Sequence, residues 1–373
     1  MKITRVEAIP LRLPELDATV ADGIQDDVLV RVHTDEGITG IGEADSSPSV
    51  VKALVDAPES WWRSRGLAGM LVGEDPLHTE RLWDKMYRGT LWMGPGGVAM
   101  HAIAAVDIAL WDIKGKALGL PVHALLGGAR RETLPVYAST LFDADRARMR
   151  ERAQRYVSDG YRAVKFGWGP MGPDFATDVA LVREARAAIG DAALLVDAGA
   201  AWTFREAVLR LDAFREYAPF WLEEALASDD LEGWARLAAA AGDIRLATGE
   251  QESLASAFRD LLDVGHLDVV QPDLARAGGF TQCRRIAELA ADRRALLVPH
   301  AWKSEILVAA TVHFAATLPA VPFVEYSMAE SPLRRELARS DFVASNGAVK
   351  VSQRPGLGVE LDEDIVTRYR TDR

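Results

Sequence analysis

The stretch Leu194-Leu195-Val196-Asp197 decides the fold, because its pattern of an apolar run ending in a carboxylate recurs along the chain. The pattern returns at Phe220–Glu223 and at Arg245–Glu250, each time after a helix-like segment and at a spacing of about 25–30 residues. Near-continuous apolar runs between helices are typical of strands buried on both faces of a parallel sheet. The three runs therefore predict consecutive strand–helix units.

The same rhythm extends in both directions and gives eight runs between about residue 134 and residue 326. Eight successive units of this kind predict the α/β class and a (β/α)₈ barrel. The expected strands are Pro135–Thr140, Ala163–Gly167, Leu194–Asp197, Phe220–Glu223, Arg245–Glu250, Leu267–Asp273, Ala295–His300 and Phe323–Tyr326.

A smaller α+β unit is expected before the barrel. Residues 28–33 alternate in polarity with the period of a strand, and 38–43 read as the return strand of a hairpin. The apolar pattern over 98–118 predicts a helix that Gly119 stops. The expected domains are an α+β domain at 1–130, the barrel at 131–345, and a tail at 346–373 that returns to the first domain.

Composition and charge exclude several classes of protein. The chain has 373 residues, of which 49% are apolar, as in a globular protein with a large core rather than a disordered one. Its 43 Lys and Arg against 55 Asp and Glu give a net charge of −12, which argues against nucleic acid and anionic membranes as partners. A single cysteine, Cys283, excludes an internal disulfide and a cysteine zinc site. No apolar stretch reaches about 18 residues and no signal-peptide pattern opens the sequence, so we expect a cytoplasmic protein.

Ionisable residues end seven of the eight expected strands or lie close to their ends. In this fold, the C-terminal ends of the strands form the floor of the active site. A buried strand has no structural need for a charge, which is costly there unless it is paired or bound to a metal. One such carboxylate is most often a helix N-cap or a solvated loop residue, but that explanation fails for the whole series. The seven are Lys165, Asp197, Glu223, Glu250, Asp273, His300 and Glu325.

Three of these carboxylates, Asp197, Glu223 and Glu250, belong to consecutive strands. Adjacent strands lie about 5 Å apart, so the three side chains are expected to converge on one point. They would repel each other strongly there without a cation, and ligation by oxygen alone favours Mg²⁺ over Zn²⁺. The alternative is a hydrogen-bonded cluster of carboxyl groups with raised pKa values.

Asp273 and His300 end the next two strands. An Asp beside a His fixes the tautomer of the imidazole and raises its basicity, so His300 is expected to be a general base or acid that faces the metal-bound substrate. The alternative is a core His that a backbone carbonyl satisfies. Lys165 lies across the ring; it is a base only if burial and nearby cations lower its pKa, and otherwise it is a cation that steadies a carboxylate.

Further motifs resemble one known family. The clearest is Ala102–Lys116, AIAAVDIALWDIKGK, which is followed by Gly119-Leu-Pro-Val122 and Leu125-Leu-Gly-Gly128. The hairpin end Gly40-Ile-Gly-Glu43 and the closing Pro355-Gly-Leu-Gly358 also match. Together with the strand-end residues, these motifs span essentially the whole chain. The sequence resembles the enolase superfamily, in the mandelate racemase-like subgroup of the mandelate racemase/muconate lactonizing enzyme family.

The resemblance implies a modified TIM barrel under an α+β capping domain that both chain ends build, in a symmetric homo-oligomer. It implies one Mg²⁺ per subunit, held by the three carboxylates and chelating the carboxylate of a small-molecule substrate. A base removes the proton α to that carboxylate, and the metal stabilises the enolate. It also implies that Glu325, in protonated form, hydrogen-bonds an enolate oxygen, and that two loops, at about 14–27 and 45–52, close over the site.

Three positions depart from the pattern of the family. The second Lys of the common Lys-x-Lys motif is Gly167, the Asn usually found two residues after the first ligand is Gly199, and the usual Pro after Glu-Glu is Ala225. A racemase with two bases needs one on each face of the α-carbon. The absence of a side chain at Gly167 weakens that reading, although Lys165 remains a candidate for the second base.

The intact Asp273–His300 pair favours chemistry with one base. His300 would take the α-proton and then protonate the departing β-hydroxyl of an acid sugar, which makes the protein an acid-sugar dehydratase whose product is a 2-keto-3-deoxy acid. A polyhydroxy acid needs partners for its hydroxyl groups, and Trp168, Trp302 and Lys303 lie near strand ends where they could supply them. Ordinary core packing explains the two tryptophans equally well.

Other functions stay open at this point. Within the family, the alternatives are a racemase or epimerase and a cycloisomerase that acts on a lactone. A Schiff-base aldolase that uses Lys165 is compatible with a lysine at a strand end, but the three-carboxylate cluster argues against it. A non-catalytic binding protein on an inherited barrel would not need the full set of ligands and the Asp–His pair.

Overall fold

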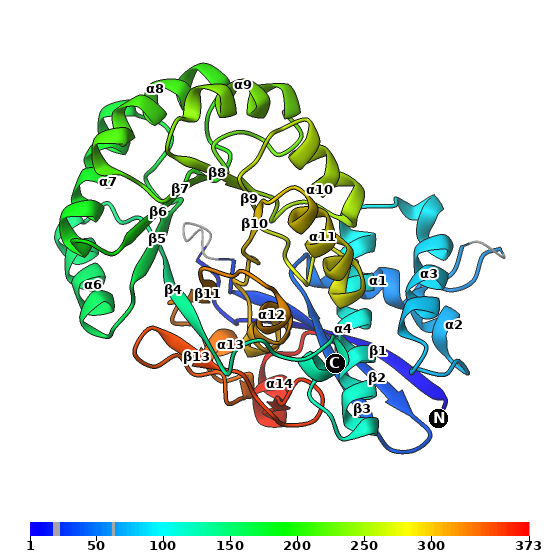
Figure 1. Ribbon diagram of the computed structural model, residues 1–373. Helices are drawn as coiled ribbons and strands as arrows, with labels where there is room; N and C mark the ends of the chain where they lie inside the picture. Colours follow the sequence, from blue (N-terminus) through cyan, green and yellow to red (C-terminus); the bar gives the residue numbers. More distant parts are fainter. Residues whose placement is uncertain (18–22, 62–63, 373) are drawn as a thin grey trace.

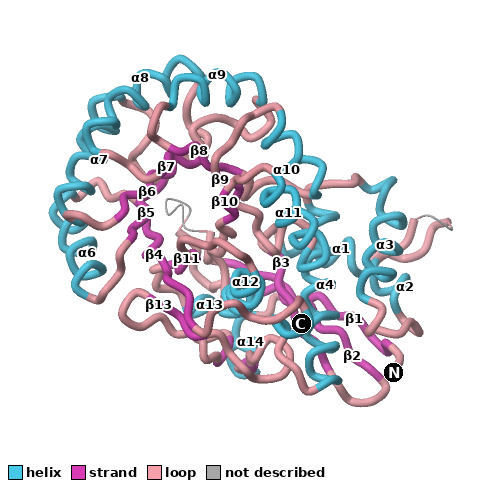
Figure 2. Tube along the Cα trace, viewed as in Figure 1, coloured by secondary structure: helices cyan, strands magenta, loops and turns pink. Residues whose placement is uncertain are grey.

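The structure is a computed structural model that describes residues 1–17, 23–61 and 64–372. Figure 1 shows a ring of strands and helices with a smaller layered unit beside it, and Figure 2 gives the same view coloured by secondary structure. The chain passes through the smaller unit, then around the ring, and finally back, so that both termini lie on the side of the smaller unit.

An antiparallel sheet of order β1-β2-β3 and a group of helices form the unit at the start of the chain. Its elements are β1 (Ile3–Arg12), β2 (Asp26–Thr34), β3 (Thr39–Ala44), α1 (Pro48–Asp56), α2 (Leu67–Leu71), α3 (Thr79–Thr90), η1 (Leu91–Met93), α4 (Val98–Leu118) and α5 (Val122–Leu125). The expected hairpin and the expected helix at 98–118 are confirmed, and the helix ends at Gly119 with a left-handed φ of 66°. Helix α1 begins at Pro48, so the predicted loop at 45–52 is shorter than expected; a proline at the first helical position explains the start.

Two glycines in β3 set the distance between the sheet and helix α4. A Cβ at Gly40 would lie 2.1 Å from the carbonyl oxygen of Ala109, and one at Gly42 would lie 1.9 Å from that of Ala105. Any side chain would push the helix off the sheet. The Gly-x-Gly at the hairpin end therefore allows the helix to pack closely against the strand.

Eight parallel strands form the ring, in the order β10-β9-β8-β7-β6-β5-β4-β11. The eight expected strands are confirmed, although the later ones are short. Glu250, Asp273 and His300 consequently follow the strand ends by two or three residues. The strands are β4 (Thr133–Leu141), β5 (Ala163–Gly167), β6 (Ala193–Asp197), β7 (Trp221–Glu223), β8 (Arg245–Thr248), β9 (Val269–Val270), β10 (Leu296–Leu297) and β11 (Val324–Ser327).

Seven long helices connect these strands and cover the outside of the ring (Figure 1). The next helix after β11 is the four-residue α13 (Pro332–Arg335), in the place of an eighth long helix, so the barrel is a modified one, as the resemblance implies. Side chains cap the N-termini of several helices: Asp145 is the N-cap of α6, and Thr203 with Glu206 forms a capping box on α8. The seven helices are α6 (Arg146–Ser158), α7 (Phe175–Ile189), α8 (Phe204–Phe214), α9 (Leu231–Ala241), α10 (Leu254–Asp263), α11 (Gly279–Asp292) and α12 (Glu305–Thr317).

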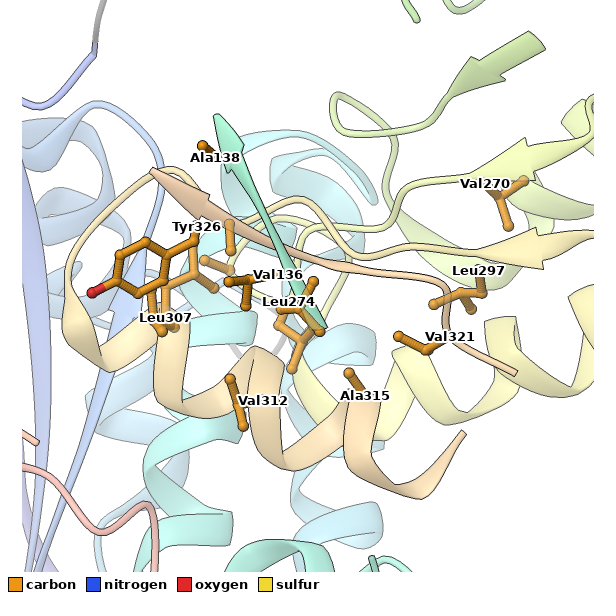
Figure 3. Close-up of a cluster of buried hydrophobic side chains, with 14 of the residues drawn as sticks. Val136, Ala138, Val270, Leu274, Leu297, Leu307, Val312, Ala315, Val321 and Tyr326 are labelled. Carbon is orange, nitrogen blue, oxygen red and sulfur yellow. The ribbon is translucent and has the colours of Figure 1, made fainter. Parts of the chain in front are cut away.

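The strands have two apolar faces, which explains their unbroken hydrophobic runs. Successive side chains of a strand point to opposite faces. In β4, Tyr137 belongs to the buried cluster inside the ring, together with Trp221 of β7. Val136 and Ala138 of the same strand lie in the outer layer, and Figure 3 shows them in the cluster that also contains Val312 of α12. The floor of the barrel is thus closed by packed side chains below the strand ends.

The last part of the chain contacts both units. Strand β13 (Ala348–Lys350) pairs antiparallel with β4 of the barrel. The chain then reaches the first unit, where Gly356 bridges to Pro121. Near the end, the Thr371 amide donates to the carbonyl oxygen of Pro10. The remaining elements of this part are β12 (Ala338–Arg339), β14 (Glu360–Leu361) and α14 (Glu363–Tyr369). Among the described residues, no helix is both long enough and apolar enough to cross a membrane.

A buried carboxyl group joins the two units and generates a pH prediction. Asp107 of α4 accepts hydrogen bonds from the amide and the hydroxyl of Thr281 in α11, at 3.0 and 2.6 Å. Burial raises the pKa of Asp107 from 3.8 to about 7, although Thr281 lowers it. The folded protein therefore keeps a proton that the unfolded chain loses above about pH 4.

We expect the wild type to lose stability relative to Asp107→Asn as the pH rises from about 4 to about 7, and the difference to be constant above that range. Urea unfolding of both proteins at a series of pH values measures it. Asp84→Asn, at an exposed position of α3, is the control. A stability difference that does not change with pH would contradict the raised pKa.

Candidate active site

A cavity of about 510 Å³ opens at the C-terminal ends of the barrel strands. The C-terminal ends of parallel strands meet at one edge of a barrel, so residues from distant parts of the sequence meet there. Six of the sequence-predicted site residues line the cavity. These are Lys165, Trp168, Asp197, Glu250, His300 and Trp302.

The three predicted metal ligands converge as expected. Asp197 and Glu223 lie opposite each other on the paired strands β6 and β7. Glu250 is the third buried carboxylate, and each of the three offers an oxygen atom that lies within 4.8 Å of the other two. Burial, reinforced by the charge of Glu223, raises the pKa of Asp197 well above its usual value. Such crowding is unfavourable for ionised oxygens without a cation. An all-oxygen set of this kind matches the ligands that Mg²⁺ prefers.

Neighbouring donors fix the orientation of the carboxylates. The Asp197 Oδ1 accepts from the Gly199 amide at 2.9 Å, and its Oδ2 accepts from the Trp168 indole at 3.1 Å. Glu223 accepts from the Trp221 indole through Oε2 at 2.8 Å. Hydrogen bonds to the groups that ligate a metal hold them in place before the ion binds.

Lys165 lies inside the carboxylate cluster. Its Nζ is 2.5 Å from Glu223 Oε1, 3.0 Å from Glu325 Oε1 and 3.7 Å from Asp197 Oδ2. Burial disfavours its charge, but Glu223 and Glu325 outweigh burial and hold the pKa of Lys165 well above its usual value. Of the two roles open to this lysine in the sequence, the geometry favours the cation that steadies carboxylates.

Asp273 and His300 form the expected pair. The His300 Nδ1 lies 2.6 Å from Asp273 Oδ2, and the other oxygen of Asp273 accepts from the Ala275 amide. Nε2 of His300 faces the cluster, 3.5 Å from Glu250 Oε2 and 3.9 Å from Glu325 Oε2. Burial lowers the pKa of His300, but these carboxylates and Asp273 overcome it and raise the pKa to about 10.

Glu325 differs from the expectation that it carries a proton. Burial favours the neutral form, but Lys165 and His300 outweigh it and lower the pKa of Glu325 to about 2. The Ser139 hydroxyl donates to its Oε1 and the Ala301 amide donates to its Oε2, each at 2.7 Å. The neighbouring carboxylates were expected to raise the pKa of Glu325. Lys165 and His300, which also lie beside it, lower the pKa instead. The contacts with Lys165 and His300 therefore favour the ionised form of Glu325.

Trp168 and Trp302 line the cavity, but Lys303 is not among its lining residues. The buried Nζ of Lys303 donates to the backbone carbonyls of Gly23 and Asp26, at 2.5 and 3.1 Å, and lies 3.5 Å from a carboxylate oxygen of Asp45. Lys303 thus fastens the predicted loops of the first domain to the barrel. Part of the 14–27 loop, residues 18–22, lies outside the described residues.

Sequence reasoning missed Arg276 and Asp45. Arg276 lines the cavity; its guanidinium donates to Asp45 Oδ2 at 2.6 Å and to the carbonyl oxygen of Glu250 at 3.2 Å. Its place three residues after Asp273 is a signal that could have found it. Asp45, directly after β3, has no local signal, because it reaches the site only through the packing of the two domains.

Comparison with known proteins assigns the chain to a family. Residues 2–127 match the N-terminal domain of the mandelate racemase / muconate lactonizing enzyme family, and residues 148–365 match the enolase C-terminal domain-like family. These matches cover most of the chain. The protein belongs to the mandelate racemase/muconate lactonizing enzyme family of the enolase superfamily.

Particular relatives carry several activities. The chain is 32% identical to a D-galactarolactone cycloisomerase from Agrobacterium fabrum, over 92% of this chain and 91% of the relative. It is 34% identical to a D-galactonate dehydratase from Xanthomonas oryzae pv. oryzae, over 91% and 90%. The 3,6-anhydro-D-galactonate cycloisomerase from Zobellia galactanivorans superposes with a TM-score of 0.90 at 32% identity over 100% of both chains. A racemase from Streptomyces coelicolor A3(2) with bound magnesium superposes with a TM-score of 0.87 at 30% identity, over 99% of this chain and 100% of that chain.

The position of Lys165 generates a prediction on stability. Lys165→Met leaves Glu223 and Glu325 buried beside each other without their cation, which typically costs about 3–5 kcal/mol when one partner of a buried pair is removed. We expect the metal-free variant to unfold at a lower temperature than the wild type, and excess MgCl₂ to raise its unfolding temperature more than it raises that of the wild type. Thermal unfolding with EDTA and with MgCl₂ measures both effects. Lys350→Met, at an exposed lysine, is the control. Equal unfolding temperatures in EDTA would contradict a structural role of this charge.

Proposed function

We propose that this protein is a Mg²⁺-dependent enzyme that removes the proton α to the carboxylate of an acid sugar and then eliminates water from the β-carbon. The product is a 2-keto-3-deoxy acid. The observation that carries the proposal is the pairing of His300 with Asp273 across one cavity from the Asp197, Glu223 and Glu250 cluster. The kinship with acid-sugar dehydratases and cycloisomerases supports the substrate class.

Asp197, Glu223 and Glu250 would hold the ion. The set contains only carboxylate oxygens, which suits a hard divalent cation. Burial and the charge of Glu223 keep the pKa of Asp197 raised although Lys165 lowers it, so one lysine does not neutralise the cluster. When bound, Mg²⁺ would offset the negative charge that builds up on the substrate carboxylate as the α-proton leaves.

His300 would act as the single base. Asp273 holds Nδ1, so Nε2 is the nitrogen that faces the cavity. The surrounding carboxylates raise the pKa of His300 to about 10. With a divalent cation held by Glu250 their effect would be smaller, and His300 would lose its proton more readily and could act as a base. After taking the α-proton, His300 would return it to the departing β-hydroxyl on the same face.

Lys165 and Glu325 would provide fixed charges rather than transfer protons. Lys165 is paired with two carboxylates, and its raised pKa keeps it charged. A Schiff-base aldolase needs a neutral lysine as nucleophile, so this contact argues against that alternative. It argues equally against Lys165 as the second base of a racemase.

A cycloisomerase or epimerase that acts on a related carboxylate substrate is the second candidate. It shares the first step with the dehydratase, and relatives of comparable identity carry both kinds of name. In a dehydratase the hydroxyl group leaves the β-carbon as water, whereas in an epimerase or a cycloisomerase a proton returns to the α-carbon. A symmetric homo-oligomer and a cytoplasmic location remain predictions from the sequence.

A screen of aldonic acids and their lactones in D₂O with Mg²⁺ tests the proposal. We expect a 2-keto-3-deoxy acid to form, with no activity in EDTA. A substrate that gains deuterium at the α-carbon, or gives its epimer or an opened or closed lactone without keto acid, would replace the dehydratase by the second candidate. Retained turnover in EDTA would contradict both.

His300→Asn should lower kcat by about 10²–10⁴-fold, because it removes the acid–base group while it leaves the three carboxylates in place. Mg²⁺ affinity, measured by titration calorimetry, should stay close to that of the wild type. His266→Asn, at a residue in the barrel that contributes nothing to the lining of the cavity, is the control. A His300→Asn variant of near wild-type kcat would remove His300 from the mechanism.

A further inference from the structure

Trp168 has an unusual backbone conformation at the wall of the cavity. It follows β5 directly, and its φ is 53°, in the left-handed region that bulky residues seldom adopt. Conformations of this kind are unfavourable and persist where the surroundings enforce them, commonly at functional sites. The ring remains 40% exposed and lines the cavity, so burial of apolar surface alone does not explain the conformation.

The indole of Trp168 contacts one of the proposed metal ligands. Its Nε1 donates to Asp197 Oδ2 at 3.1 Å, and its backbone amide donates to the carbonyl oxygen of Asp197 at 3.3 Å. The Gly199 amide donates to Oδ1 of the same carboxylate. Each oxygen of Asp197 therefore accepts one N–H and retains a lone pair for an ion. Two fixed donors prevent rotation of the carboxylate.

Two glycines provide the space for this arrangement. A Cβ at Gly199 would lie 3.0 Å from Cδ2 and 3.1 Å from Cε2 of the Trp168 ring. A Cβ at Gly167 would lie 2.8 Å from Oδ2 and 2.9 Å from Cβ of Asp197. These are two of the three positions at which the sequence departs from the common pattern of its family. The missing side chain at Gly199 leaves room for the indole, and the missing side chain at Gly167 leaves room for the Asp197 carboxylate that the indole holds.

We propose that Trp168 is a positioning residue for the metal site, and that its indole N–H, in the space that Gly167 and Gly199 leave open, holds Asp197 in the orientation that binds Mg²⁺. The inference rests on the proposed function only in taking Asp197 as a ligand of the ion. Groups that hydrogen-bond to metal ligands typically change metal affinity by 10–100-fold when they are removed. The indole is such a group, supplied by the residue next to Gly167.

The first test measures Mg²⁺ affinity by titration calorimetry without substrate. Trp168→Phe keeps an aromatic ring in the wall and removes the N–H, and we expect Mg²⁺ to bind about 10-fold more weakly. Trp302→Phe removes an indole N–H from the same cavity and should leave the affinity unchanged. An equal loss in both variants, or no loss in Trp168→Phe, overturns the proposal.

The second test is a double-mutant cycle between Trp168 and Gly199. Gly199→Ala should weaken Mg²⁺ binding in the wild type because the new methyl group would lie 3.0 Å from the indole and push it away from its hydrogen bond with Asp197. In the Trp168→Ala background that space is empty, and we expect Gly199→Ala to weaken binding less than twofold further. The backbone strain of alanine at a φ of 58° is present in both backgrounds, so it cancels in the comparison. Additive losses would overturn the proposal.

Tryptophan emission reports whether Mg²⁺ binds beside the Trp168 indole. Mg²⁺ should change the emission of the wild type and of Trp302→Phe, but Trp168→Phe should lose most of that change. A wild type that binds no Mg²⁺ would refute the metal site of the proposed function and this inference with it. If Trp168→Phe binds Mg²⁺ as tightly as the wild type does, the role of Trp168 is refuted and the metal site of the proposed function is not.

Discussion

The ion pair of Lys165 with Glu223 and Glu325 is the interaction on which the rest of the site depends. Lys165 reaches both carboxylates from β5, inside the cluster to which Asp197 also belongs. Without a buried cation, the carboxylates gathered by the barrel would repel each other or take up protons. With it, the pKa of Glu325 is lowered, and the charge of Glu325 in turn helps to raise the pKa of His300. The charge of one lysine thus influences the protonation of several neighbours.

A second set of cations joins the two domains. Lys303 and Arg276, both from the barrel, contact Asp45 at the end of β3, and Lys303 also binds carbonyl oxygens of the first domain. The first domain is therefore held to the barrel by residues close to the proposed catalytic pair, since Arg276 lies three positions after Asp273 and Lys303 three positions after His300. The contact between the domains and the charge of the cavity wall thus depend on neighbouring residues.

The sequence predicted what short-range patterns encode. Buried parallel strands require apolar runs, so eight strands could be recognised, and a charge that ends such a run marks the site. It could not predict what depends on packing between distant segments. Three features result from contacts between residues far apart in the sequence. They are the lowered pKa of Glu325, the contact of Lys303 with the first domain, and the Arg276–Asp45 ion pair. Gly167 and Gly199 were visible as departures, but their cause required the position of the Trp168 ring.

The tail has a consequence for how the protein is made. Arg370 bridges to Leu11, and Glu363 of α14 forms an ion pair with Arg31 of β2 at 2.8 Å. The first sheet is therefore contacted by residues that follow the whole barrel in the sequence, at Leu11 on its edge strand β1 and at Arg31 on its central strand β2. These contacts can form only after the barrel has been synthesised, so the last part of the chain completes the packing of a sheet that was made before the barrel.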